Sequence, residues 1–355
     1  MNRHGGNIVA TARELGCRVT DLIDMSSNLT PLGMAPGLRK TLEQGLDQIA
    51  YLPETASETL RRLFAAAHGL AEDEVLVGNG TTEFIFDLPR LFAGGRALIV
   101  TPTYADYTLA CSWAGMQAEE FMLDPDSDFQ LPLERLAAEL NGGELVFLCN
   151  PNNPTGGLLP HDVLRDFLNR HPRTFFLVDE SYLPFTREPS LLAAPLPANL
   201  FVLFSSSKIY GIPGLRLGFL AARPANLRRF GERRRPWGVN RLAQLAGEYL
   251  LQYGEEYADE VRAFVATERP WFIAELARIP AIRIVPGAAN FILCRLTGRM
   301  RAAELRERML ACRIMIRNCA NFSGLDDSYF RVSLKSRREN ETFLRALTAI
   351  LATAE

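Results

Sequence analysis

Short apolar runs alternate with amphipathic segments of helical length from about residue 74 onward. The apolar runs are predicted to be strands, and they lie at six places: Glu74 to Val77, Arg96 to Thr101, Glu144 to Cys149, Thr174 to Val178, Phe201 to Phe204 and Leu215 to Leu220. Helical patterns follow four residues, two of them prolines that favour the first turn of a helix: Gly80, Tyr104, Pro132 and Pro160. Strands that alternate with helices indicate a mostly parallel sheet covered by helices.

The pattern changes after residue 240. A long helical stretch runs from Arg241 to Ile279. Beyond it, three short apolar runs predict the strands of a smaller sheet: Ile282 to Val285, Asn290 to Cys294 and Tyr329 to Leu334. We therefore expect a second, smaller domain at the C-terminal end.

Composition and charge exclude several partners. The chain has 355 residues, 48% of them hydrophobic, which is enough for a substantial core or two unequal ones. Since 39 Lys and Arg nearly balance 41 Asp and Glu, we expect no nucleic-acid or membrane partner, and local arginines must hold any anionic ligand. The six cysteines form no CxxC pair and no Cys/His cluster, so we expect neither disulfides nor a bound metal. The N-terminus lacks the apolar run of a secretory signal and no stretch is long enough to span a bilayer, which predicts a cytoplasmic protein.

A lysine stands directly after one of the predicted strands. Ser205 to Lys208 follows the apolar run and leads into a segment rich in glycine and proline that ends at Arg216 and Gly218. A lysine amine is a nucleophile toward an aldehyde when its surroundings lower its pKa, and small hydroxyl residues leave room for a bulky cofactor. An ordinary surface lysine explains this segment equally well. The glycine spacing of a P-loop is absent.

An aspartate ends another buried run. Asp179 lies where the ligands of open α/β sheets collect, and a buried carboxylate requires a partner. The protonated pyridine nitrogen of pyridoxal 5'-phosphate (PLP) would be one, and Tyr182 could then hydrogen-bond the phenolic oxygen of that cofactor. The alternative is a helix N-cap aspartate followed by a core tyrosine.

Three further motifs follow strand ends. Asn150 to Gly156 forms a stiff turn that would let Asn153 donate to the same phenolic oxygen. Gly78 to Thr82 lies between a strand and a helix, where backbone amides can bind a phosphate. Tyr104 is placed to stack on an aromatic ring. A plain turn, a tight connection and a core tyrosine would explain each motif alone, but the joint occurrence of all five is difficult to explain by structure alone.

Together these motifs resemble those of the fold-type I PLP enzymes, specifically the class I/II aminotransferase superfamily, over nearly the whole chain. The resemblance implies an aspartate-aminotransferase-like α/β fold: a large domain with a mostly parallel, seven-stranded type of sheet sandwiched by helices, and a smaller α+β C-terminal domain. It implies that Lys208 carries the cofactor as a Schiff base, with Asp179 on the pyridine nitrogen. It also implies further cofactor-binding residues, namely Asn153 and Tyr182 on the phenolic oxygen, Tyr104 stacked on the ring, and Gly80, Thr81, Thr82, Ser205, Ser207 and Arg216 around the phosphate. Arg331 matches the arginine that grips the substrate carboxylate, a task for which its forked guanidinium is suited.

Within that superfamily the chain is similar to the threonine-phosphate decarboxylases, relatives of the histidinol-phosphate aminotransferases. The segments that carry this similarity are His4 to Asn7, Ser26 to Gly33, Pro236 to Asn240 and Ile316 to Cys319. It implies an N-terminal arm (1–30) that closes over the active site, a large PLP-binding domain (31–240) and a small domain (241–355). It also implies substrate contacts by His4, Gly5, Asn28 and Arg317, and a homodimer with the active site at the subunit interface. A terminal histidine without a function is the alternative for His4.

One position departs from the pattern. Relatives carry a tyrosine directly before a proline, and this tyrosine reaches the neighbouring subunit's cofactor phosphate, whereas here the order is Tyr51, Leu52, Pro53. Either the tyrosine is shifted by one position or Leu52 replaces it.

The resemblance favours decarboxylation of a phosphorylated amino acid, L-threonine O-3-phosphate or its serine analogue, to an amino-alcohol phosphate for cobalamin biosynthesis. The cofactor motifs are shared with aminotransferases, so an aminotransferase acting on histidinol phosphate or another amino acid stays open. Two alternatives from other functional classes also stay open: a non-catalytic PLP-binding protein and a structural homodimer without cofactor.

Overall fold

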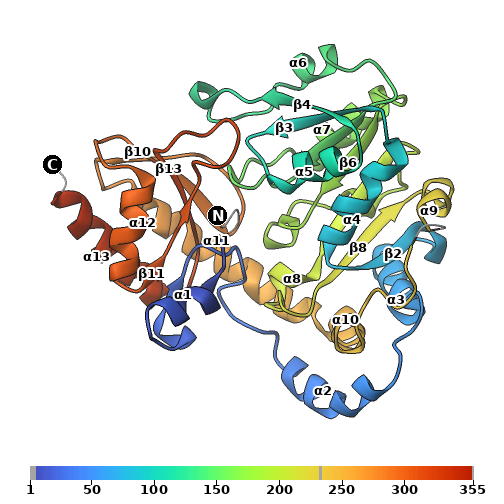
Figure 1. The fold of residues 1–355 in the computed structure, drawn as a ribbon, viewed down its shortest axis with the longest axis horizontal. Helices are drawn as coiled ribbons and strands as arrows, with labels where there is room; N and C mark the ends of the chain where they lie inside the picture. The colour runs from blue at the N-terminus through green and yellow to red at the C-terminus, as the bar shows by residue number, and fades with distance from the viewer. Residues whose placement is uncertain (1–4, 232–233, 354–355) are drawn as a thin grey trace.

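The chain folds around two β-sheets that lie side by side (Figure 1). The computed structural model describes residues 5–231 and 234–353. The larger sheet has the strand order β2-β8-β7-β6-β5-β3-β4. Its strands are β2 (Val75–Asn79), β3 (Arg96–Thr101), β4 (Gln117–Met122), β5 (Leu145–Cys149), β6 (Phe175–Asp179), β7 (Leu200–Ser205) and β8 (Leu217–Ala222). Because only β8 runs against its neighbours, the predicted mostly parallel sheet is confirmed.

The central strands are buried on both faces. In β5, Leu145 and Phe147 point into one apolar cluster, and Val146 and Leu148 point into another. Side chains alternate between the two faces of a strand, so an unbroken apolar run needs a helical layer on each side. One layer contains α4 (Thr81–Asp87), α5 (Asp106–Trp113) and α9 (Pro224–Gly231), and the other contains α3 (Glu58–His68), α6 (Leu133–Ala138), α7 (His161–Arg170) and α10 (Arg241–Tyr253).

The structure differs from the predicted helices in two details. Pro132 and Pro160 are the N-caps of α6 and α7 and not first-turn residues, because ψ is 93° at Pro132 and 144° at Pro160, outside the helical range. The long helical stretch after residue 240 is two helices, α10 and α11 (Glu255–Leu276), separated by Gly254.

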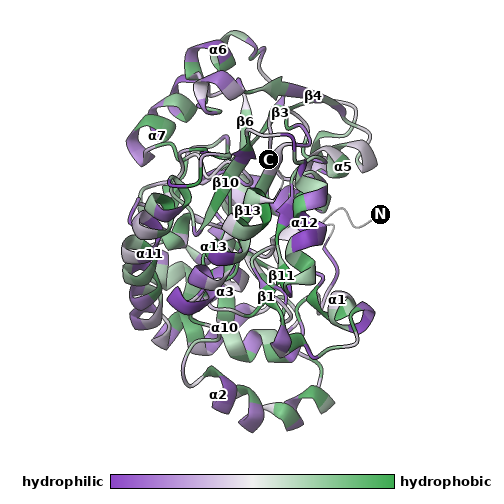
Figure 2. Cartoon of the chain, turned by 90° about the vertical axis from the view of Figure 1, so that its left-hand side faces the viewer, coloured by the Kyte–Doolittle hydropathy of each residue, from purple (hydrophilic) through white to green (hydrophobic). Residues whose placement is uncertain are grey.

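The smaller sheet is antiparallel and has the order β12-β13-β10-β9. Its strands are β9 (Ile282–Ile284), β10 (Phe291–Leu296), β12 (Arg317–Asn318) and β13 (Tyr329–Ser333), and the helices nearby are α11, α12 (Ala302–Ala311) and α13 (Arg337–Ala352). Outer helices such as α11 and α13 show both hydrophobic and hydrophilic residues, as expected of helices with one face on a core (Figure 2).

The N-terminal residues pack on the smaller sheet. After α1 (Ile8–Glu14), strand β1 (Ile23–Asp24) pairs in parallel with β11 (Ile314–Met315). The Ser333 N–H donates to the carbonyl of Met25 at 2.9 Å, which joins this segment to β13. The chain then crosses toward the larger sheet, where the Thr30 N–H donates to the carbonyl of Lys208 at 3.0 Å.

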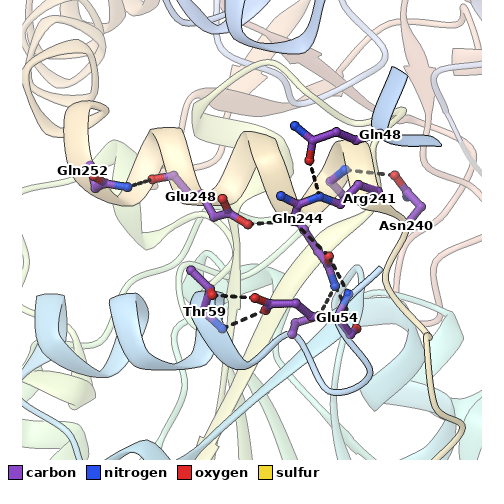
Figure 3. A network of polar contacts seen from close by, with 10 residues as sticks. Gln48, Glu54, Thr59, Asn240, Arg241, Gln244, Glu248 and Gln252 are labelled. Atoms are coloured by element: carbon purple, nitrogen blue, oxygen red, sulfur yellow. Dashed lines mark hydrogen bonds and ion pairs between the residues drawn. The ribbon is translucent and has the colours of Figure 1, made fainter. Parts of the chain in front are cut away.

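Helix α10 holds the segment that follows α2 (Leu38–Gln44) through a network of polar groups, most of them partly buried (Figure 3). The fully buried Gln244 side chain bonds both backbone groups of Glu54. Arg241 donates to Gln48 at 2.9 Å and pairs with Glu248 at 2.8 Å. This network fixes a surface segment in which the side chains of Tyr51 and Leu52 are 73% and 74% exposed.

The remaining helical elements are short: α8 (Ser206–Ile209), η1 (Val19–Asp21), η2 (Leu46–Ala50), η3 (Glu72–Glu74), η4 (Leu88–Phe92), η5 (Pro125–Ser127), η6 (Leu183–Phe185) and η7 (Leu191–Ala193). Across residues 5–231 and 234–353, no helix is both long and apolar enough to cross a membrane.

Candidate active site

A pocket of about 150 Å³ is lined by Lys208 of α8 and by Arg317 and Arg331 of the smaller sheet. Eight of the predicted site residues line it: Gly5, Asn28, Tyr104, Asn153, Tyr182, Lys208, Arg317 and Arg331. Several of them follow strands whose carboxyl ends converge at one edge of the larger sheet, the place where ligands of such sheets bind. His4 lies outside the described residues.

Lys208 stands on α8, directly after β7, and its partly buried side chain reaches the pocket. Burial, helped by the charges of Arg216 and Arg331 and opposed by that of Asp179, lowers the pKa of its amine from 10.5 to about 8. A lysine with such a pKa is partly neutral near pH 8, and the neutral amine is the form that attacks an aldehyde.

Asp179 ends β6, and its side chain is only 5% exposed. Oδ1 accepts the Ser181 N–H at 2.9 Å, and Oδ2 accepts the hydroxyl of Tyr107 at 2.8 Å. Asp179 does not cap a helix, because Tyr182 is the N-cap of the next helical element, η6. Both donors are neutral, so neither competes with a cationic ligand as an ion-pair partner of this carboxylate.

Tyr107 was not among the predicted site residues. It lies on α5, three residues after Tyr104, which precedes the helix, and the centroids of the two rings are 5.6 Å apart. The signal in the sequence is that spacing alone, and only the structure brings the hydroxyl to Asp179.

Arg216 and the turn after β2 form the second part of the site. Gly80 has φ of +73°, and a Cβ added there would lie 2.4 Å from Nη2 of Arg216. That guanidinium also donates to the hydroxyl of Thr82 at 3.2 Å. A Cβ on Gly218 would lie 2.5 Å from the amide nitrogen of Thr81. Only glycine therefore allows the guanidinium and the turn to approach so closely, and together they offer a cation and donors to a phosphate.

The other two residues predicted for the phosphate lie beside this turn. Ser205 and Ser207 are both buried, and the Ser207 hydroxyl donates to the carbonyl of Leu217 at 3.4 Å. Since β7 and β8 are adjacent strands, both serines come near Arg216.

Arg331 on β13 is 5% exposed and lines the pocket from the smaller sheet. It donates to the side-chain oxygen of Asn153 and to the carbonyl of Ser26, the latter at 3.0 Å, and it lies 5.2 Å from the centre of the Phe291 ring. Because Oδ1 of Asn153 is engaged, its NH₂ is the group left to donate into the pocket.

Two buried donors at the pocket have no acceptor among the described residues: Nε of Arg331 and Nδ2 of Asn28. An unpaired buried donor is costly, so such groups indicate an acceptor supplied by a ligand. Tyr182 adds a phenol whose pKa burial raises to about 12, which keeps it protonated. These donors, with the lysine amine and the arginine at the glycine turn, fit PLP and an anionic substrate.

Arg317 and Gly5 lie on the outer side of the pocket. Arg317 is 9% exposed, donates to Asn321 at 2.7 Å and lies 5.2 Å from the Phe322 ring centre. It also lines an adjoining pocket of about 370 Å³. A Cβ on Gly5 would lie 2.6 Å from the carbonyl oxygen of Ser26, so this position has no room for a side chain. Phe322 was not predicted, since no motif marks it. Ser26 begins one of the segments that carry the similarity to threonine-phosphate decarboxylases, but no role was predicted for it.

The fold and this pocket define a PLP-dependent enzyme of fold type I. Residues 20–350 match the family model described as aminotransferase class I and II, and the chain belongs to that family. Its cofactor is PLP.

The relatives with similar sequences include threonine-phosphate decarboxylases and histidinol-phosphate aminotransferases. The chain is 36% identical to the threonine-phosphate decarboxylase of Salmonella typhimurium over 98% of this chain and 96% of that protein. It is 33% identical to the histidinol-phosphate aminotransferase of Moorella thermoacetica over 98% of this chain and 90% of that protein. A solved structure of L-threonine-O-3-phosphate decarboxylase from Porphyromonas gingivalis superposes with a TM-score of 0.85 at 31% identity, covering 93% of this chain and all of that chain (100%).

Proposed function

We propose that this enzyme decarboxylates a phosphorylated amino acid, L-threonine O-3-phosphate or its serine analogue, to an amino-alcohol phosphate used in cobalamin biosynthesis. The similarity to threonine-phosphate decarboxylases supports the reaction. A 28% identical relative from Leptospira interrogans is named an adenosylcobalamin biosynthesis bifunctional protein, which supports the pathway; this chain covers 41% of it.

The observation that carries the proposal is a pair of buried arginines. Arg317 on β12 and Arg331 on β13 are register partners across adjacent antiparallel strands. Like charges directly opposite each other are unfavourable, and burial makes them more so. The position of both side chains at the pocket supports a substrate with two anionic groups, a carboxylate on Arg331 and a phosphate on Arg317. Histidinol phosphate has only one anionic group, because its phosphate ester itself stands in place of the carboxylate.

The other residues have assigned tasks under this proposal. Lys208 holds the cofactor, and Asp179 stabilises the positive charge of its ring nitrogen. When bound, PLP supplies a conjugated cation that can accept the electrons left when carbon dioxide departs. Arg331 and Asn28 fix the carboxylate so that the bond to Cα is held in the reactive orientation. The amine of Lys208 returns a proton to Cα after carbon dioxide has left.

The experiment is a substrate panel. The purified enzyme with PLP is incubated separately with O-phosphothreonine, O-phosphoserine and histidinol phosphate, with 2-oxoglutarate present in a second series. We expect carbon dioxide and the amino-alcohol phosphate from a phosphoamino acid, independent of 2-oxoglutarate. No carbon dioxide from either phosphoamino acid, with a keto product from histidinol phosphate, would show an aminotransferase instead. Absence of any turnover, with no change in the cofactor spectrum, would favour the non-catalytic alternative.

We also propose a homodimer with the active site at the subunit interface. The segment fixed by Gln244 and Arg241 presents Ile49, Tyr51 and Leu52 with more than half of each side chain exposed, which is unusual for apolar groups in one stretch. An I49E/L52E variant should shift from dimer to monomer in light scattering after gel filtration. If the wild type is itself a monomer, this proposal fails.

A further inference from the structure

The hydroxyl of Tyr107 contacts Asp179 of the candidate active site, although Tyr107 does not line the pocket itself. Tyr107 is 1% exposed, and its ring lies between those of Tyr104 and Phe147, with centroids 5.6 Å and 5.3 Å away. Its hydroxyl donates to Oδ2 of Asp179 at 2.8 Å and also lies beside the thiol of Cys149.

The direction of this hydrogen bond is determined by chemistry. Burial and the charge of Asp179 raise the pKa of the Tyr107 hydroxyl well above its ordinary value, so the phenol keeps its proton. A carboxylate can only accept, so the phenol donates. Cys149, the register partner of Asp179 on β5, donates its thiol to the carbonyl of Pro151 at 3.2 Å.

A donor on a carboxylate stabilises its anion relative to the protonated acid. When a carboxylate shares a proton with a pyridine nitrogen, such a donor keeps the proton on nitrogen. Asp179 has two such donors, Ser181 N–H and Tyr107 O–H. The first is a backbone group that the turn supplies in any case, and the second depends on one side chain.

We propose that Tyr107 is a positioning residue that holds Asp179 as an anion and thereby keeps the shared proton on the ring nitrogen of PLP. This inference rests on the proposed role of Asp179. It concerns the state of the bound cofactor before any substrate arrives, so it can be measured without turnover.

The test uses PLP labelled with ¹⁵N in the ring, bound to the wild type and to three variants: Y107F, D179N and Y257F. The ¹⁵N chemical shift reports whether the ring nitrogen is protonated. Tyr257 is a matched control, because it is 6% exposed and its hydroxyl donates to the carbonyl of Gly33 and not to Asp179. All four proteins are also titrated with PLP, and their melting temperatures are measured.

We expect the Y107F signal to move toward that of unprotonated pyridine and its dissociation constant for PLP to rise about tenfold, the effect of losing one charge-assisted hydrogen bond. D179N should show the full shift. Y257F should lower the melting temperature by a comparable amount without moving the signal. Incorporation of 3-fluorotyrosine at position 107, which retains shape and donates more strongly, should keep the protonated signal, and it serves as the test if Y107F does not fold.

An unchanged signal in Y107F beside a shifted signal in D179N would overturn the role of Tyr107 and leave that of Asp179 intact. An unchanged signal in D179N would overturn the role of Asp179 itself. If 3-fluorotyrosine moved the signal toward unprotonated pyridine, the proposed direction of the effect would be wrong.

Discussion

Arg331 on β13 donates a hydrogen bond to the side-chain oxygen of Asn153, in the turn that follows β5. This contact joins the smaller sheet to the larger one at the pocket. It also orients both side chains. The NH₂ of Asn153 is left to donate into the pocket, and Nε of Arg331 has no acceptor among the described residues. A change at Arg331 should therefore affect the substrate carboxylate and the cofactor contact together.

An R331K variant should lose about 10- to 100-fold in kcat/KM for the phosphoamino acid. Lysine keeps the charge but cannot form the two parallel hydrogen bonds of a guanidinium, and the hydrogen bonds of charged groups contribute about 1.5–3 kcal/mol each. Steady-state kinetics checks this. R295K, on neighbouring β10 and outside the pocket lining, is the control and should keep wild-type values. Wild-type kcat/KM in R331K would contradict the assignment.

Binding of PLP to the apo-enzyme should accelerate with pH and level off above about pH 8, because the pKa of Lys208 is lowered to about 8 and only its neutral amine reacts. Nα-acetyl-lysine, the reference amine, should show its inflection near pH 10.4. Stopped-flow absorbance measures both rates. An inflection above pH 10 in the protein would show that burial does not perturb this lysine.

The lowered pKa of Lys208 also makes the stability of the apo-enzyme depend on pH. Between pH 8 and 10.5 the unfolded chain binds more protons at Lys208 than the folded chain does, so this group makes the free energy of unfolding of the apo-enzyme rise with pH over that window. A K208M variant should lack this part of the rise.

A G5A substitution should disturb the segment that lines the outer side of the pocket. The added Cβ would lie 2.6 Å from the Ser26 carbonyl oxygen, a backbone atom that also accepts from Arg331. We expect KM for the substrate to rise several-fold while PLP binding at Lys208 persists. G298A is the control, because a Cβ there meets nothing within 4 Å. Equal kinetics in the two variants would mean that the segment near Gly5 does not shape the substrate site.

The positions of the strands and of most site residues could be predicted because the signals are local. A buried parallel strand is a continuous apolar run, as in Arg96 to Thr101, and the residues after such strands converge at one edge of the sheet. The positions of the strand ends therefore sufficed to predict that four residues lie close together: Lys208, Asp179, Asn153 and Tyr104.

Other features depend on contacts that no local pattern records. β4 was missed because it is an edge strand in which five of six residues are exposed, so its sequence is not apolar. The two-residue strand β12 is too short to show any periodicity, yet its register with β13 places Arg317 opposite Arg331. The contact between Tyr107 and Asp179 likewise joins residues 72 positions apart.

Glu180, the neighbour of Asp179, is the last testable group. It points away from the pocket, is 1% exposed, and accepts hydrogen bonds from the Ser190 hydroxyl and from Leu191 N–H, the latter at 2.9 Å. Burial raises the pKa of its carboxyl to about 7. The folded chain therefore binds more protons than the unfolded chain between pH 4.5 and 7, and the stability from this group is full below pH 4.5 and lost as the pH rises through 7.

An E180Q variant should lack this dependence, since the glutamine amide is neutral at every pH and can keep a hydrogen bond to each of the two partners. The difference in free energy of unfolding between E180Q and the wild type should thus grow in favour of E180Q from pH 4.5 to 8, as measured by urea denaturation at each pH. E256Q, at an exposed position in the first turn of α11, controls for removal of one carboxylate. A difference that stays constant over this pH range would mean that Glu180 is already ionised in the folded protein at pH 5, with its charge stabilised by the two hydrogen bonds alone.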